Sequence, residues 1–257
     1  MYYKEALRVG RALFYYAIVV GALTLIGALV HGGQIFVDTS SGSHNDAAKL
    51  AHVQLPFSIL FVVPSIAAAI FGSIAGISLS TENDGHLEVA WTRPASRVRY
   101  ALAIFGTDIV AIVAAFALGF AGCWIATAAH GGLRYLVVDP DTGGELARYV
   151  LYPMAWFGLC EALTASVRSR GGAFAGFAWP IAFVLLMLDQ LHLQPVWHAF
   201  FRFINYANPL RYASMTIGAS ASTDLVNIAL PVALTGLSAI AIIGIVLALL
   251  QWRRLEA

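Results

Sequence analysis

Six long runs of apolar residues constrain this chain more than any other feature of its sequence. The apolar core of a bilayer is about 30 Å thick, and an α-helix needs about 20 apolar residues to cross it. The runs that meet this requirement cover residues 12–30, 55–79, 101–129, 147–165, 173–191 and 227–250. Each is continuously apolar rather than alternating, which favours helices over the strands of a membrane barrel. The sequence therefore predicts an all-α integral membrane protein with six transmembrane helices, forming one domain over residues 1–257.

The composition points to the same class of protein. Hydrophobic residues make up 60% of the chain, against about 45–50% in a soluble domain. The formal net charge is +1, so there is no general basic field, and we expect membrane lipids rather than nucleic acid as the surroundings. Cys123 and Cys160 both lie inside apolar runs, where a thiol serves as a small hydrophobic group, and we expect no disulfide between them.

The positions of lysine and arginine predict the orientation of the chain. Connections that face the cytoplasm carry an excess of both residues. One set of segments carries ten of them: Lys4, Arg8, Arg11, Arg93, Arg97, Arg99, Arg168, Arg170, Arg253 and Arg254. The opposite set carries five, in longer loops: Lys49, Arg134, Arg148, Arg202 and Arg211. The sequence thus predicts a multi-pass protein of the cell inner membrane with both termini in the cytoplasm.

Two acidic residues lie inside the predicted spans and are candidates for a polar substrate path. Exposing an ionisable group to lipid costs several kcal/mol, so such groups are either bonded internally or functional. Asp108 lies about two turns from the cytoplasmic end of its span, where a paired carboxylate is the alternative interpretation. Glu161 lies in the middle of the fourth span, and its alternative is an interhelical hydrogen bond in the protonated form.

The connection between the fifth and sixth spans contains an aromatic stripe. Trp197, Phe200 and Phe201 follow helical spacing, which predicts an interfacial or re-entrant helix on the outer side of the membrane. Asn208 and Pro209 end this helix, and a second short helix is expected near Tyr212. These six residues are candidates for an outer gate, with a peripheral anchor as the alternative.

Known catalytic and metal-binding motifs are missing from the sequence. Six of the seven histidines lie in or beside the predicted outer segments, but none forms a ligand pair of standard spacing. Nucleophile-elbow, zinc-protease and Walker motifs are absent as well. We therefore expect a non-catalytic chain without a metal site. Two alternatives stay open: an intramembrane enzyme that uses Glu161, Asp108 or the outer histidines, and a membrane scaffold or sensor.

The segment from Ser80 to Tyr100 is densely charged, although only 11% of the chain is charged. Its sequence, STENDGHLEVAWTRPASRVRY, resembles the cytoplasmic loop of ABC-2 type ABC transporter permeases, which runs roughly Gly-Thr-Leu-Glu and then Thr-x-Pro-x-Ser-Arg. His86 replaces the usual threonine, and Trp91 stands where an aliphatic residue is commoner. Asn208-Pro209-Leu210 with Tyr212 is similar to the Asn-Pro-Leu-x-Tyr region of the same family.

The resemblance implies a permease subunit of an ATP-driven transporter. In that family the cytoplasmic loop contains a short coupling helix that docks on a separate ATP-binding subunit. Two permease chains, identical or related, assemble with two such subunits, which bind ATP and Mg²⁺. The implied cargo is hydrophobic or amphipathic, such as a drug, a lipid or a lipid-linked molecule, and it moves outward. The residues that the resemblance places at the ATPase contact are Glu82, Gly85, Leu87, Glu88, Thr92, Arg93, Pro94, Ser96 and Arg97.

Overall fold

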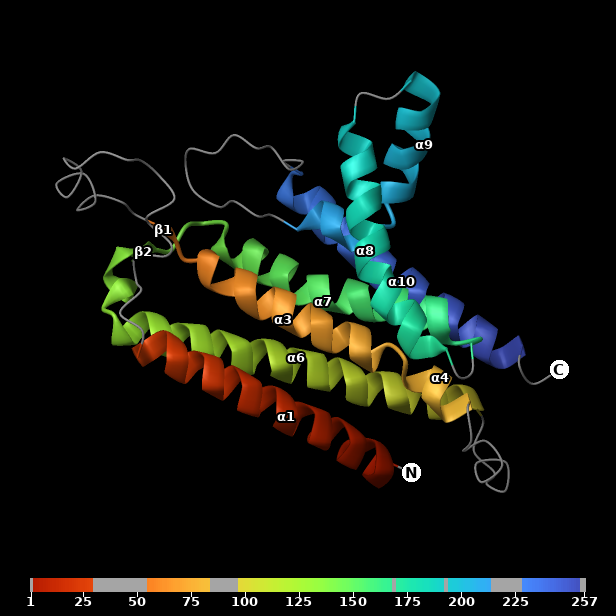
Figure 1. Ribbon diagram of the computed structural model, residues 1–257, viewed down its shortest axis with the longest axis horizontal. Helices are drawn as coiled ribbons and strands as arrows, with labels where there is room; N and C mark the ends of the chain where they lie inside the picture. The colour runs from red at the N-terminus through yellow and green to blue at the C-terminus, as the bar shows by residue number, and fades with distance from the viewer. Residues whose placement is uncertain are drawn as a thin grey trace.

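The structure is a computed structural model that describes residues 2–29, 55–83, 97–167, 170–191, 194–213 and 228–254. These parts of the chain are mostly helical (Figure 1). The α-helices are α1 (Tyr2–Leu29), α3 (Ile59–Ala75), α4 (Ser78–Asn83), α6 (Arg97–Ala129), α7 (Thr142–Thr164), α8 (Gly171–Gln190), α9 (Pro195–Asn205) and α10 (Leu230–Arg254). Two 3-10 helices are η1 (Gly132–Tyr135) and η2 (Pro209–Tyr212). The two-residue strands β1 (Leu55–Pro56) and β2 (Leu136–Val137) pair in parallel.

Five stretches of helix in the described ranges are long and apolar enough to cross a membrane. They are Ala6–Leu29, Ile59–Glu82, Val98–Ala129, Gly171–Asp189 and Leu230–Arg254. Each overlaps a predicted run, so the prediction of a multi-pass, all-α membrane protein is confirmed in this general form. The remaining run, 147–165, is helical as α7 but does not meet the same requirement. The charged residues of this run, Arg148 and Glu161, lower its apolar character.

The described helix ends gather at two ends of a bundle (Figure 1). The terminal end, as we call it, holds the start of α1, the end of α10, α4, the start of α6 and the turn between α7 and α8. The opposite end holds the β1–β2 pair, the end of α1 and the start of α10. α8 leaves the terminal end at a steep angle to α3, α6 and α7, and α9 folds back beside α8, clear of the other helices. The ends of α1, α3, α6, α7 and α10 are grouped as expected for helices that cross one layer.

α7 lies at the centre of the bundle. It packs against α3 on one side and α10 on the other, and side chains along its length are buried, among them Trp156, Phe157 and Glu161, each 0% exposed. The contact with α10 is backbone to backbone: a Cβ added at Gly158 would lie 2.7 Å from the carbonyl oxygen of Ala241. Small residues permit such close approach of membrane helices. Because neighbouring helices cover α7, this helix can carry acids that a lipid-facing helix could not.

Candidate functional site

The predicted ATPase contact falls largely outside the described residues. This applies to Gly85, Leu87, Glu88, Thr92, Arg93, Pro94 and Ser96. The two other predicted residues border this stretch: Glu82 lies in α4, and Arg97 is the first residue of α6. The structure therefore describes how the segment is joined to the bundle.

Glu82 faces the interior of the protein. It is 6% exposed, and its Oε2 accepts a hydrogen bond of 2.7 Å from the hydroxyl of Tyr100 in α6. This bond joins the helix before residues 84–96 to the helix after them. The contact of Glu82 with a partner stays a prediction, and within the described chain Glu82 is a buried link between α4 and α6.

α4 is also bonded to α7 and to the turn that follows it. The hydroxyl of Ser78 donates to Oε1 of Glu161 at 2.6 Å, and the hydroxyl of Ser80 donates to the carbonyl oxygen of Val167. Ser78 is 0% and Ser80 is 2% exposed, so both bonds are shielded from solvent. We call Ser78, Ser80, Glu82, Tyr100 and Glu161 the α4 cluster.

Glu161 is the most deeply buried acid of this cluster. Its side chain is 0% exposed, and within the described residues Oε2 has no hydrogen-bond partner. The interhelical hydrogen bond expected as the alternative for this residue is present, with Ser78 as the donor. Sequence reasoning missed Ser78 and Tyr100, because a serine and a tyrosine beside an apolar run carry no pattern that points to a partner.

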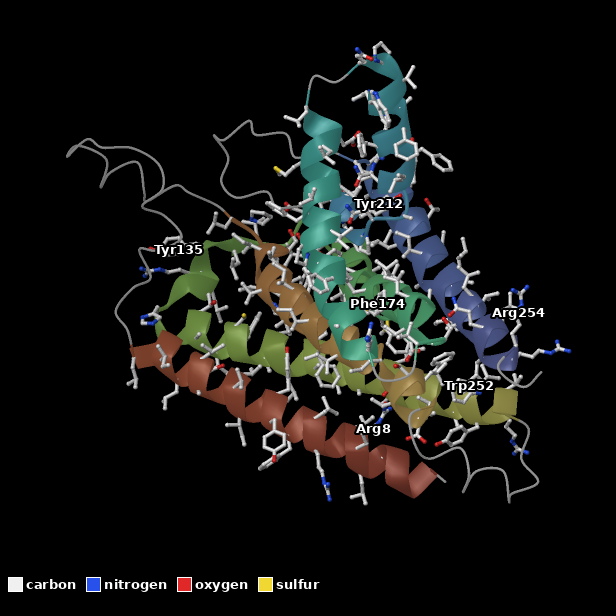
Figure 2. All side chains as sticks on the ribbon, turned by 45° about the vertical axis from the view of Figure 1, so that its right-hand side comes forward. Arg8, Tyr135, Phe174, Tyr212, Trp252 and Arg254 are labelled. Carbon is white, nitrogen blue, oxygen red and sulfur yellow. The ribbon has the colours of Figure 1, made fainter. Side chains whose placement is uncertain are left out.

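Asp108 is paired with a basic residue. Its Oδ1 lies 2.8 Å from Nη2 of Arg8, and the Asp108 side chain is 2% exposed. Arg8 points from α1 towards the interior of the bundle (Figure 2). A charge pair of this kind ties α1 to α6, as the alternative interpretation of Asp108 expects. The arrangement gives Asp108 a structural partner and does not bring it into a pocket with the other candidates.

The Asn-Pro-Leu-x-Tyr stretch forms a second polar cluster, here called the 208–212 joint. Nδ2 of Asn208 donates to the carbonyl oxygen of Ala182 at 2.7 Å and to Oδ1 of Asn205 at 2.8 Å. Its own Oδ1 accepts from the backbone N–H of Leu210 at 3.1 Å. Asn208, Pro209 and Tyr212 are all buried. The side chain of Asn208 thereby fastens the start of η2 to α8.

Tyr212 connects the joint to α7 and α10. Its carbonyl oxygen accepts a 2.8 Å bond from Nε of the buried Arg148, and its hydroxyl donates to the carbonyl oxygen of Tyr206 at 3.0 Å. Burial raises the pKa of this hydroxyl. The ring lies against α10 where Gly236 has no side chain: a Cβ there would meet the ring at 2.5 Å. Sequence reasoning did not select Arg148 as a buried residue of this cluster, although its position inside an apolar run could have indicated it.

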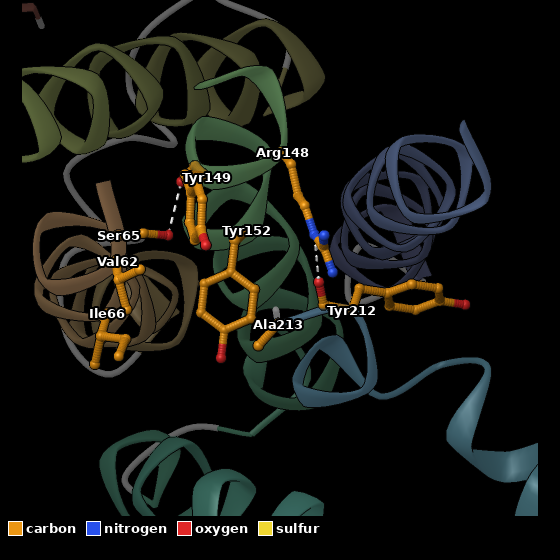
Figure 3. Close-up of a pocket in the computed structure, with 8 residues that line it drawn as sticks. All are labelled: Val62, Ser65, Ile66, Arg148, Tyr149, Tyr152, Tyr212 and Ala213. Atoms are coloured by element: carbon orange, nitrogen blue, oxygen red, sulfur yellow. Dashed lines mark hydrogen bonds between the residues drawn. The ribbon is translucent and has the colours of Figure 1, made fainter. Parts of the chain in front are cut away.

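A small pocket lies between α3, α7 and this joint (Figure 3). It is lined by Val62, Ser65, Ile66, Arg148, Tyr149, Tyr152, Tyr212 and Ala213. Two hydrogen bonds fix its walls, from Ser65 to the Tyr149 carbonyl oxygen and from Arg148 to the Tyr212 carbonyl oxygen. The ring of Tyr212 points away from the pocket. Neither Asp108 nor Glu161 lines it, so this pocket does not unite the predicted polar path residues.

The aromatic residues of α9 differ from the joint in their exposure. Trp197 and Phe200 are 54% and 50% exposed, and Phe201 is half-buried. The three rings contact one another, with centroids 5.5 to 6.4 Å apart. The six predicted outer-gate residues thus separate into an exposed aromatic patch (Trp197, Phe200, Phe201) and a buried joint (Asn208, Pro209, Tyr212).

The described residues bring together neither a metal-binding cluster nor a disulfide. Within the described ranges no three His, Cys, Asp or Glu side chains gather to hold a metal ion, and His130 bonds the carbonyl oxygen of Gly27 at 2.7 Å. Cys123 is partly buried and Cys160 is buried, and both are free thiols. Comparison with family models, with curated proteins and with solved structures finds no match to this chain.

Proposed function

We propose that this chain is the transmembrane permease subunit of an ATP-driven transporter of the ABC-2 type. A separate ATP-binding subunit drives it through the segment from Ser80 to Tyr100. The observation that carries the proposal is the motif of that segment, with Gly85-His86-Leu87-Glu88 followed by Thr92-x-Pro94-x-Ser96-Arg97. The chain itself carries no Walker motif, so the partner supplies the site for ATP and Mg²⁺.

The attachment of the segment supports this role. A partner that pushes on a cytoplasmic segment moves a membrane helix only if the ends of the segment are firmly joined to the bundle. Here the preceding helix is bonded to the following one through Glu82 and Tyr100. The bonds made by Ser78 and Ser80 join the same helix to α7 and the turn after it. A flexible loop that merely enforced topology would need none of these buried bonds.

The proposed topology adds α7 to the five long apolar helices, which gives six spans, and it places the terminal end in the cytoplasm. Cations on the outer side are fewer in sequence, and two of them are internal: Arg148 is 5% and Arg211 is 7% exposed. Arg211 donates to the carbonyl oxygen of Arg202 at 3.1 Å and lies 4.2 Å from the ring centroid of Tyr206. Arg148 likewise donates to the carbonyl oxygen of Tyr212, so both arginines have structural roles. Fewer cations are then left on the surface of the outer side, and the terminal end is the more basic of the two.

The proposed cargo is a hydrophobic or amphipathic molecule that moves outward, because the helices offer apolar surfaces with few charges. The functional unit contains two permease chains and two ATP-binding subunits in the inner membrane. We expect the exposed aromatic patch of α9 to lie in the outer interface, where tryptophan is favoured.

Co-purification tests the proposal. The neighbouring open reading frames are first searched for a Walker-motif ATP-binding protein, whose absence would count against the proposal. The tagged chain is then expressed with that protein, extracted in detergent, and compared with a variant that carries Glu88→Lys and Arg97→Glu. We expect the variant to lose the ATP-binding protein and its stimulated ATP hydrolysis. The control reverses two exposed charges at the opposite end, Arg134→Glu and Asp139→Lys, and should keep both. Undiminished assembly and hydrolysis in the first variant would contradict the assigned contact.

A further inference from the structure

We propose that the hydrogen bond between Ser78 and Glu161 transmits movement of α4 to α7. Glu161 is then a positioning residue in the drive of the transporter and not a wall of its substrate path. This inference rests on the proposed function, because it assigns a route by which a partner at the end of α4 would move the bundle.

α4 and the turn that precedes it are bonded to α7 and the turn that follows it at three points. Glu161 accepts from Ser78 at 2.6 Å, and one turn later Thr164 donates to the carbonyl oxygen of Gly76 at 2.8 Å. After a further three residues, the carbonyl oxygen of Val167 accepts from Ser80. Positions three apart lie on one face of a helix. The last turn of α7 and the turn after it therefore form a continuous seat for α4.

The link between α4 and α3 is weaker than this seat. Regular helix is interrupted between Ala75 and Ser78, and Gly76 caps the end of α3 through its N–H to Gly72. The carbonyl of Gly76 is bonded by Thr164 of α7 rather than by the next turn of its own helix. A rotation of α4 can therefore be absorbed at residues 76–77. The same rotation cannot leave α7 behind without breaking buried hydrogen bonds.

α7 in turn moves together with α10. The backbones of the two helices meet at Gly158 and Gly244, where a side chain on either residue would collide with the facing backbone. Nε2 of Gln251 also donates to the carbonyl oxygen of Ala162 at 2.8 Å, close to the seat of α4. Packed cores of this kind shift as units instead of deforming continuously. A movement of α4 that displaces Glu161 would therefore displace α7 and α10 together.

Glu161 has the features of a transmission contact. It is fully buried, yet within the described residues Oε2 has no hydrogen-bond partner. The Ser78 hydroxyl can exchange one carboxyl oxygen for the other as α4 turns, so contact persists through a small rotation. A carboxyl group that lined a substrate path would instead face an open cavity, and Glu161 is 0% exposed.

Paired spin labels test this route in the assembled transporter. The labels are placed at exposed positions near the opposite end, Ile125→Cys on α6 and Val232→Cys on α10, in a chain that also carries Cys123→Ala and Cys160→Ala. Inter-label distances are measured in lipid nanodiscs without nucleotide and with ATP and vanadate. We expect ATP to shift the distances in this background and equally with Glu161→Gln, whose carboxamide oxygen still accepts from Ser78. With Ser78→Ala or Glu161→Leu, the ratio of shifted to unshifted populations should fall at least about fivefold.

The outcomes separate this inference from the proposed function. A shift in Ser78→Ala and Glu161→Leu equal to that of the background overturns the transmission role and leaves the permease assignment standing. The absence of any ATP-dependent shift in the background itself contradicts the permease assignment. Ser65→Ala is the matched control, because it removes another buried serine hydrogen bond from the same stretch, that to the Tyr149 carbonyl oxygen. This variant should shift as the background does, and all variants should retain the ATP-binding subunit.

Discussion

The α4 cluster and the 208–212 joint are both buried polar clusters attached to α7, and they differ in how fully their key side chain is bonded. In the joint, both ends of the Asn208 amide are engaged, in bonds to Ala182, Asn205 and Leu210. In the α4 cluster, Glu161 uses one oxygen on Ser78 and leaves the other without a partner within the described chain. A fully bonded amide fixes one geometry, whereas a half-bonded carboxyl group tolerates a change of partner oxygen. The comparison assigns a static role to the joint and a moving role to the cluster.

Both regions are attached to α7, which packs closely against α10. We therefore expect the largest loss of stability when the contact between α7 and α10 is broken. Gly158→Val would place a side chain against the Ala241 backbone, where even a Cβ meets the carbonyl oxygen at 2.7 Å. The helices must separate, and we expect a loss of about 3 kcal/mol in the free energy of unfolding. Urea unfolding in mixed micelles, followed by circular dichroism, measures it. If Gly158→Val unfolds like the unchanged chain, the close contact is not the support of the two clusters.

The matched control for this prediction is Gly106→Val. Gly106 lies in α6, and a Cβ there meets no atom within 4 Å. The same substitution at this site should change stability by less than about 0.5 kcal/mol. An equal loss in both variants would mean that valine itself, and not the collision with α10, lowers stability.

The next largest effect should come from Asn208→Ala in the joint. The substitution removes three hydrogen bonds of a side chain that is 4% exposed, and leaves the N–H of Leu210 without its partner. We expect about 2 kcal/mol of destabilisation, the cost of an unmade buried bond together with lost contacts. Under the same urea assay, Gln194→Ala at an exposed polar position serves as the control. A loss of stability no greater than that of the control would contradict the proposal that the joint holds the fold in one geometry.

The positions of the helices could be predicted from sequence because crossing lipid requires a minimum apolar length. The five long apolar helices lie where apolar runs predicted them. The central place of α7 could not be predicted in this way. Its acids and its arginine lower its apolar character, and burial by neighbours, which decides whether such residues are tolerated, is a property of the assembled bundle.

The contacts of the candidate site were less accessible to sequence reasoning. Ser78 and Glu161 are 83 residues apart in the chain, and no local spacing joins them. The charge density around Glu82 predicted ion pairs with a partner or within the segment, and in the described chain this residue is buried and bonded to Tyr100. For Asp108, the shallow depth in its span pointed to a paired carboxylate, and Arg8 provides the pair. A local pattern of residue types indicates that a buried polar group needs a partner, but it does not identify a partner that lies 83 or 100 residues away in the chain.

A smaller effect is expected from Ser78→Ala, and it tests the moving role of the α4 cluster. One hydrogen bond is lost, and the carboxyl group of Glu161 keeps its burial, so we expect about 1 kcal/mol of destabilisation. Glu161→Gln should cost less than about 0.5 kcal/mol, because its amide oxygen still accepts from Ser78. Hydrogen exchange of the backbone amides of α4, read by mass spectrometry, should rise in Ser78→Ala and stay unchanged in Glu161→Gln. Equal hydrogen exchange in the two variants would contradict the claim that the Ser78–Glu161 bond holds α4 against α7.

The smallest effect is expected at Trp197, whose side chain is 54% exposed on α9. Its removal in Trp197→Ala leaves the joint and both of its connections to α7 and α10 in place. We therefore expect a change in unfolding free energy below about 0.5 kcal/mol in micelles. Trp156→Ala is the informative contrast, because Trp156 is 0% exposed and stacks on Trp179 at 4.0 Å between centroids. It should cost several times more than Trp197→Ala. A large loss on removing Trp197 would show that the aromatic patch helps to hold the fold, and the separation of the patch from the joint would no longer stand.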